Sequence, residues 1–220
     1  MHINWRQMER MEGMRVVAEI MPHLKDVDMK PAVIRVRQAK LAFYDQYVFY
    51  ELTDPSQNPQ ASIYALHKPG CEEEEATLVL DGTNRPIYTA NEWAPLILDA
   101  GNIPSYVGFF FACVVGTHGP MAVVEKLEDM TPEKAAQEAA DQGASPQEQE
   151  KMAERVRTVQ GICPPRVLNI ESNGIYTVAA AMLFQNCIFR TKMEITTQGL
   201  IRITEHDMMI GGMDSADEED

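Results

Sequence analysis

The sequence lacks the features of a membrane protein and of a disulfide-bonded protein. Its longest apolar run, Tyr106–Val115, is half of the roughly 20 residues that a membrane-spanning helix needs. Its four cysteines stand far apart, at positions 71, 113, 163 and 187, and two of them, Cys113 and Cys187, lie within apolar runs and are expected to be buried thiols. Met1–Met21 carries charges throughout, unlike the apolar centre of a signal peptide. We therefore expect a cytoplasmic protein that does not enter a membrane.

Signatures of known catalytic and metal sites are also missing. None of the five histidines stands at metal-ligand spacing from another, and there is no His-Glu-x-x-His sequence. There is no Gly-x-Ser-x-Gly turn, no cysteine–histidine signature and no dinucleotide-binding fingerprint. We therefore predict no metal and no cofactor, and these absences favour a non-catalytic protein over an enzyme.

Positive charge is scarce. The chain has 19 Lys and Arg against 33 Asp and Glu, a formal net charge of −14. Residues 1–60 are balanced, so the whole excess of negative charge lies in residues 61–220. Because an acidic surface repels phosphate backbones, we predict no direct binding of DNA or RNA. Imitation of nucleic acid by the acidic surface remains a third functional hypothesis.

What the sequence does contain is a block of alternating apolar and polar residues in its last third. Asn173-Gly174 separates two of the runs, and this dipeptide is a strong hairpin signal because both residues tolerate a positive φ. Such a pattern predicts an antiparallel meander with one buried face and one solvent-exposed face. The four runs are Arg166–Glu171, Ile175–Phe184, Ile188–Thr196 and Leu200–Thr204.

The period of two assigns each side chain of the meander to a face. The solvent-exposed face is expected to carry Arg190, Lys192, Glu194 and Arg202. The buried face either packs in the core or lines a ligand cavity, because the alternating pattern indicates which side chains are buried but not whether the space beside them is filled. We expect it to carry Tyr176, Val178, Ala180, Met182, Phe184, Phe189, Thr191, Met193 and Ile195.

Two helices are predicted to pack on this sheet. Asn102–Val115 is apolar all round in its second half, which predicts a buried central helix. At the N-terminus, Asn4–Gln7 has the layout of a capping box, and the helix that follows ends at Pro22. We expect this N-terminal helix to bury Met11, Met14, Ala18 and Met21 against the inner face of the sheet.

The remaining segments complete an α+β fold. We expect an edge strand at Ala32–Arg37, one or two strands within Leu41–Leu52, a hairpin from Ser62–His67 and Ala76–Asp81, and irregular structure over Ile87–Leu98. Pro132 and the Ser145–Glu148 capping box predict two helices with one thin apolar stripe. The predicted organisation is one domain of residues 1–130 and 161–212, a helical-hairpin insertion of residues 131–160, and a disordered acidic tail of residues 213–220.

The first functional hypothesis is a non-catalytic protein that binds another protein or serves as an accessory subunit. It rests on the methionine-rich N-terminal helix, the polar helical hairpin and the acidic tail, together with the missing catalytic motifs. Its partner-binding residues would be Trp5, Met8, Met11, Met152 and Val156. The oligomeric state is left open.

The alternative is a small-ligand-binding protein or a cofactor-free enzyme. Its pocket would lie between the sheet and the helix of residues 102–115. His118 is the strongest catalytic candidate because two glycines flank its turn, where a ligand could approach the backbone and the ring. Asp81, Tyr88 and Tyr176 are the other polar candidates.

Overall fold

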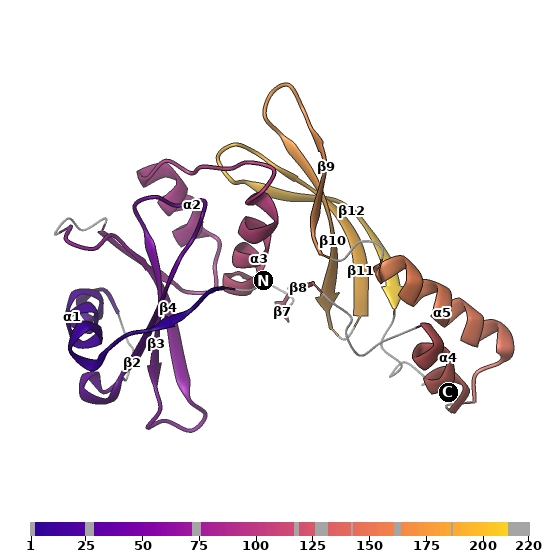
Figure 1. Cartoon of the computed structure of the whole chain (residues 1–220), viewed down its shortest axis with the longest axis horizontal. Helices are drawn as coiled ribbons and strands as arrows, with labels where there is room; N and C mark the ends of the chain where they lie inside the picture. The colour runs from indigo at the N-terminus through magenta and orange to yellow at the C-terminus, as the bar shows by residue number, and fades with distance from the viewer. Residues whose placement is uncertain are drawn as a thin grey trace, which may run out of the picture. The chain divides into compact units, whose positions relative to one another are not determined.

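A computed structural model describes residues 3–24, 29–71, 76–116, 119–125, 132–141, 143–160, 164–185 and 187–210. Antiparallel sheets and helices build the described chain (Figure 1), which confirms the predicted α+β class. The chain divides into two compact units. We refer to His2–Asn102 as the N-terminal unit and to Ile103–Asp220 as the C-terminal unit.

The N-terminal unit is built on a five-stranded antiparallel sheet in which strands follow one another in chain order. Its strands are β1 (Arg6–Gln7), β2 (Arg35–Lys40), β3 (Val48–Asp54), β4 (Ala61–His67) and β5 (Thr77–Leu80). The predicted pairing of the last two strands is confirmed. β2 had been expected at an edge but lies inside the sheet, because β1 pairs with its outer side.

Helix α1 (Arg10–Ile20) packs on this first sheet rather than on the meander as predicted, and two further expectations about it were wrong. The capping box does not form, because Arg6 and Gln7 pair with β2 and the helix begins after Glu9. The buried stripe is also displaced from Met11 and Met14, which are 69% and 50% exposed. The cluster beneath the helix instead joins it to β2, β3 and β4 through Met8, Val16, Val17, Ile20, Met29, Val36, Tyr50, Leu52 and Ala65.

A second helix of this unit, α2 (Arg85–Trp93), had been expected as irregular structure. Pro86 stands in its first turn, where a missing N–H costs nothing. Ile87 and Ala90 are buried, and the helix contacts β5. The sequence pattern did not predict this helix, because two buried residues are too few to show a helical periodicity.

The C-terminal unit contains the predicted meander. Its sheet has the order β12-β11-β10-β8, and β9 also pairs with β10. Both β8 and β9 lie on the edge of β10 that β11 leaves open, β9 against Tyr176–Ala179 and β8 against Ala181–Leu183. The strands are β8 (Ala122–Val124), β9 (Arg166–Ile170), β10 (Tyr176–Phe184), β11 (Cys187–Ile195) and β12 (Ile201–Ile210).

The register assigns side chains to faces as the alternation predicts. Val178 stands opposite Met193, and Ala180 opposite Thr191, on the inner face. The outer face carries three cross-strand ion pairs, at N–O distances of 2.6 to 2.9 Å. They are Arg190–Asp207, Lys192–Glu205 and Arg202–Glu194.

Three helices belong to the same unit: α3 (Ile103–Cys113), α4 (Pro132–Asp141) and α5 (Pro146–Gln160). Helix α3 contacts β8 and β9, and the Tyr106 hydroxyl donates a 2.8 Å hydrogen bond to the Gly199 carbonyl in the β11–β12 turn. The predicted capping box of α5 forms, because the Ser145 N–H donates to Glu148 Oε2 at 2.7 Å. Helix α5 contacts β12 and buries Ala153 and Val156.

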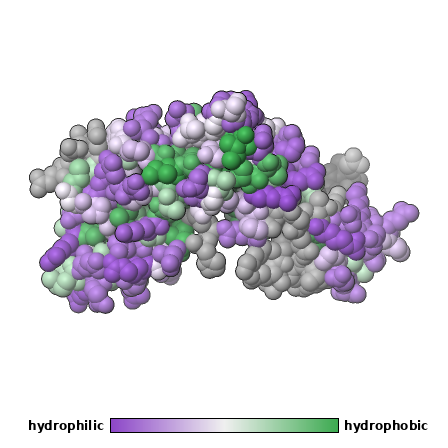
Figure 2. Space-filling view, turned by 45° about the horizontal axis from the view of Figure 1, so that its top comes forward, coloured by the Kyte–Doolittle hydropathy of each residue, from purple (hydrophilic) through white to green (hydrophobic). Residues whose placement is uncertain are grey.

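Figure 2 shows one face of the described residues coloured by hydropathy. Hydrophobic residues gather there in small patches among hydrophilic ones. Within the described part of the chain, no helix combines the length and the apolar character needed to cross a bilayer.

The β9–β10 turn provides a test of the meander. Gly174 has φ +82°, and a Cβ added there would lie 2.7 Å from Thr197 Cγ2 of the β11–β12 turn. We expect Gly174→Ala to lower the free energy of unfolding by about 1–2 kcal/mol for the positive φ, with a further loss from the clash. Gly70→Ala, at φ +75° with open space around it, should show the first loss alone.

Urea denaturation of both variants and of Gly174→Ala combined with Thr197→Ser separates the two effects. Serine lacks the methyl group, so the double variant should recover the extra loss. Equal stability of the two glycine variants would contradict the contact between the turns.

Candidate functional site

A pocket of about 490 Å³ opens in the C-terminal unit, on the inner face of the meander. Volumes of about 300–1,000 Å³ are typical of small-molecule sites. The pocket is walled mainly by apolar side chains, and no Lys, Arg, Asp or Glu is among its described lining residues. They are Gly116, Gly119, Met121, Phe184, Phe189, Thr191, Ile203 and His206.

A β-bulge brings His206 to the pocket. Ile203 pairs with Met193, but the next inner-face pair is His206 with Thr191, because Thr204 is an extra residue in the ladder. Without the bulge, Ile203 and His206 would lie on opposite faces. The His206 ring instead meets the ring of Phe189 edge-on, at a centroid distance of 6.4 Å.

Two glycines line another part of the pocket. Strands β6 (Val115–Gly116) and β7 (Gly119–Pro120) pair antiparallel shortly after α3, and β8 follows β7 in the chain. Gly119 has φ +115°, which side chains rarely allow. Because Gly116 and Gly119 have no side chains, they leave the space beside them in the pocket open.

The four polar residues predicted for a ligand site do not come together in one described unit. His118 lies outside the described residues. Tyr176 is half-buried in β10 and is not among the lining residues. Asp81 and Tyr88 belong to the N-terminal unit. His206 and Phe189, which do line the pocket, were not singled out as site residues, because the bulge shifts the alternation that would have placed His206.

Asp81 has the local role predicted for a turn aspartate. Its Oδ1 accepts hydrogen bonds from the Thr83 N–H at 2.9 Å and the Thr83 hydroxyl at 2.7 Å. The hydroxyl bond, the larger cause, together with the N–H bond holds the pKa of Asp81 below its usual value. A carboxylate stabilised in its charged form and engaged in its own turn is poorly suited to act as a general base.

The residues predicted for partner binding differ in exposure. Met11 is exposed, whereas Met8 is buried beneath α1 and Val156 is buried on α5. Met152 is half-buried. Trp5 is half-buried as well, 4.9 Å from the Phe49 ring. They are divided between the two units.

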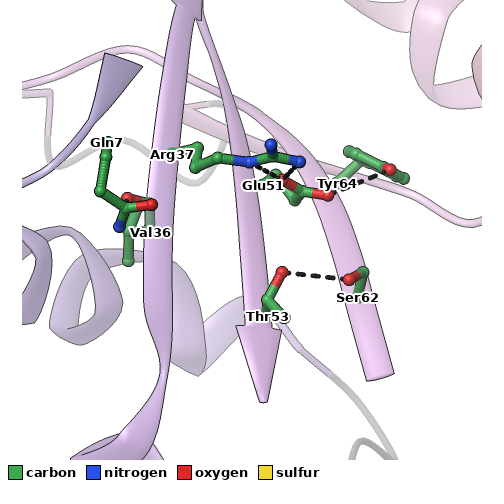
Figure 3. A network of polar contacts seen from close by, with 7 residues as sticks. All are labelled: Gln7, Val36, Arg37, Glu51, Thr53, Ser62 and Tyr64. Carbon is green, nitrogen blue, oxygen red and sulfur yellow. Dashed lines mark hydrogen bonds and ion pairs between the residues drawn. The ribbon is translucent and has the colours of Figure 1, made fainter. Parts of the chain in front are cut away.

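A polar network lies on the sheet of the N-terminal unit (Figure 3). The Arg37 guanidinium forms an ion pair with the buried Glu51, which also accepts a 3.3 Å hydrogen bond from the Tyr64 hydroxyl. Thr53 and Ser62 bond to each other at 3.0 Å. Because these groups bind across β2, β3 and β4, the network joins strands and leaves no group directed at a ligand.

A second cluster, with a buried imidazole and hydroxyl and an exposed carboxylate, has the layout of a carboxylate–imidazole–hydroxyl relay. His67 Nε2 lies 2.8 Å from Glu19 Oε2, and His67 Nδ1 lies 2.8 Å from Thr77 Oγ1. Both His67 and Thr77 are buried beneath α1, so a substrate cannot reach the hydroxyl. Burial and the charges of Glu19 and Glu12 raise the pKa of the neighbouring Tyr50 to about 12, so its hydroxyl stays protonated. The cluster therefore holds α1 to the sheet.

No group of three or more potential metal ligands occurs among the residues that the structure describes. Burial raises the pKa of Cys113 to about 12, so this thiol is not activated as a nucleophile.

The Arg37–Glu51 pair can be tested as a structural element. Glu51→Ala removes a carboxylate that is 6% exposed and leaves Arg37 without its partner, so we expect a loss of about 1–3 kcal/mol in unfolding free energy. Glu12→Ala breaks the exposed Arg6–Glu12 pair and should cost less than about 1 kcal/mol. Equal urea midpoints for the two variants would contradict a stabilising network.

Comparisons with models of protein families, with curated proteins and with solved structures found no match to this chain. Its function therefore has to be inferred from its own geometry.

Proposed function

We propose that the protein binds a small, mainly apolar molecule in the pocket of the C-terminal unit. The observation that carries this proposal is the 490 Å³ pocket with an apolar, uncharged described lining. Burying apolar ligand surface contributes roughly 25 cal/mol per Å², so such a lining favours an apolar occupant. The volume is too small for a helix of another protein, whose diameter is about 10–12 Å.

Binding rather than chemistry is the activity that these residues support. Thr191 is buried, and its hydroxyl donates to the Ala180 carbonyl at 3.1 Å, so it is not activated by a base. His206 is the one titratable side chain among the described lining residues. An imidazole without a second catalytic group can orient a ligand by a hydrogen bond.

Filling the pocket tests the proposal. Ile203 lines the pocket and is 37% exposed, so Ile203→Trp can place an indole in the space without disturbing the core. We expect the wild type to bind the neutral dye N-phenyl-1-naphthylamine with a saturable rise in fluorescence, and Ile203→Trp to weaken this binding at least tenfold. Leu200→Trp is the matched control, because Leu200 is exposed directly before the same strand and is not among the lining residues.

If the wild type does not bind the dye, or if both tryptophan variants bind it equally, the proposed pocket function is wrong. Circular dichroism of each variant verifies that the fold is retained.

A second candidate function is the recruitment of a protein partner through the N-terminal unit. What supports it is the exposure of Met11 and Met14 on α1 and of Val33 on the 3-10 helix η2 (Pro31–Val33), which contacts α1. Exposed methionines adapt to varied apolar surfaces. Trp5 and Met8 would then act through the packing that positions this surface, whereas Met152 and Val156 belong to α5 of the C-terminal unit and would contribute to a partner contact only there.

Photo-crosslinking in the native cell tests this second candidate. A photoreactive residue at Met11 or Met14 should capture one stoichiometric partner, and the same residue at Ser62 should not. The adduct from position 14 should be lost when Met11→Glu is added. A diffuse set of adducts that Met11→Glu leaves unchanged would contradict a defined interface.

The predicted organisation is retained as part of the proposal. That residues 131–160 are an insertion is supported by β8 and β9, which pair along the same edge of β10, so the segment leaves and rejoins the sheet at one edge. The single domain of residues 1–130 and 161–212 remains a prediction. The cytoplasmic location, the lack of nucleic-acid binding and the disordered tail of residues 213–220 also remain predictions, and the tail lies outside the described residues.

A further inference from the structure

The walls of the pocket favour a flat aromatic ligand. Phe184 and Phe189 come from β10 and β11, and Ile203 comes from β12, so the sheet side of the pocket is aromatic and aliphatic. Aromatic rings pack on one another edge-on or offset and gain about 0.5–1.5 kcal/mol beyond the burial of area. Phe189 already makes one such contact, with the His206 ring at an interplanar angle of 61°.

Charge excludes an ionic ligand. The ion pairs of β11 and β12 lie on the outer face, where Arg190, Lys192 and Arg202 are each bound to a carboxylate. The described lining therefore offers no counter-ion, and a charged ligand would lose its hydration without compensation. The negative charge of residues 61–220 further disfavours an anion. The described lining therefore favours a neutral ligand.

The polar group at the rim is the His206 ring. The Thr191 hydroxyl opposite it in the ladder already donates to the Ala180 carbonyl, whereas no hydrogen bond joins the His206 ring to another described residue. A neutral imidazole has one N–H donor and one nitrogen acceptor. A hydroxyl group pairs with either nitrogen, because it both donates and accepts.

We infer that the ligand is a neutral hydroxylated aromatic molecule of the phenol class. Its ring lies against Phe184, Phe189 and Ile203, and its hydroxyl binds the His206 imidazole at the rim of the pocket. This inference rests on the proposed pocket function and adds the chemical class of the ligand and the residue that selects it.

Two ligands of matched shape test it. The wild type should bind 2-naphthol about five- to tenfold more tightly than 2-methylnaphthalene, the gain of one net hydrogen bond. 2-Naphthoate, an anion, should bind more weakly than 2-naphthol. Displacement of N-phenyl-1-naphthylamine at pH 7.5 measures all three affinities.

The variants assign the selectivity to one residue. In His206→Phe, the ratio between 2-naphthol and 2-methylnaphthalene should fall to about one, while 2-methylnaphthalene keeps its affinity within about twofold. Met208→Leu is the control, because Met208 is exposed on the same strand and does not line the pocket; its ratio should match the wild type.

The possible failures are distinguishable. Equal binding of 2-naphthol and 2-methylnaphthalene by the wild type, or a ratio unchanged in His206→Phe, overturns this inference and leaves the pocket function intact. Tighter binding of 2-naphthoate overturns the claim of a neutral ligand. If neither the dye nor any naphthalene binds, the proposed function fails, and the inference fails with it.

Discussion

The register of β10 against β11 is the constraint on which the C-terminal unit depends. Nine consecutive residue pairs, from Tyr176–Ile195 to Phe184–Cys187, place all the inner-face side chains on one side. A slip of one residue would turn the paired Arg190, Lys192 and Glu194 toward the core and the apolar set toward water. A one-residue slip would therefore both bury charged side chains and expose apolar ones. The burial of the inner face and the ion pairs of the outer face thus favour the same register.

Within that register, one irregularity in β12 brings a histidine to the face that lines the pocket. The extra residue Thr204 reverses the alternation of β12, so that Ile203 and His206 share a face although three positions separate them. An imidazole thereby joins Thr191 on a sheet face whose other lining residues are apolar. Bulges often redirect a side chain in this way next to functional sites.

The sequence predicts the meander well because alternation, turns and burial agree there. The Asn173-Gly174 turn, the opposed faces and the α3 helix are all visible in the residue pattern. Prediction fails where tertiary contacts override the local pattern. Asn4–Gln7 reads as a helix cap, yet Arg6 and Gln7 find backbone partners in β2. That pairing also moves the start of α1 and turns Met11 toward solvent.

The pocket itself could be predicted only in part. The apolar alternation shows that one sheet face could line a cavity. Whether that cavity is empty depends on which other side chains pack against the face.

Different parts of the chain lie near the two ends of the inner face, α3 near one end and Gly116 and Gly119 near the other. Near the β11–β12 turn, where Tyr106 of α3 binds the Gly199 carbonyl, Met193 and Ile195 are fully buried. Past the end of α3, the chain covers the sheet with Gly116 and Gly119, which have no side chains to fill the space. A close-packed interior tolerates few voids, because each forfeits dispersion contacts along its lining. The opening combines two glycines, two phenylalanine rings and a histidine redirected by a bulge, and the proposed ligand would restore the dispersion contacts that these side chains lack.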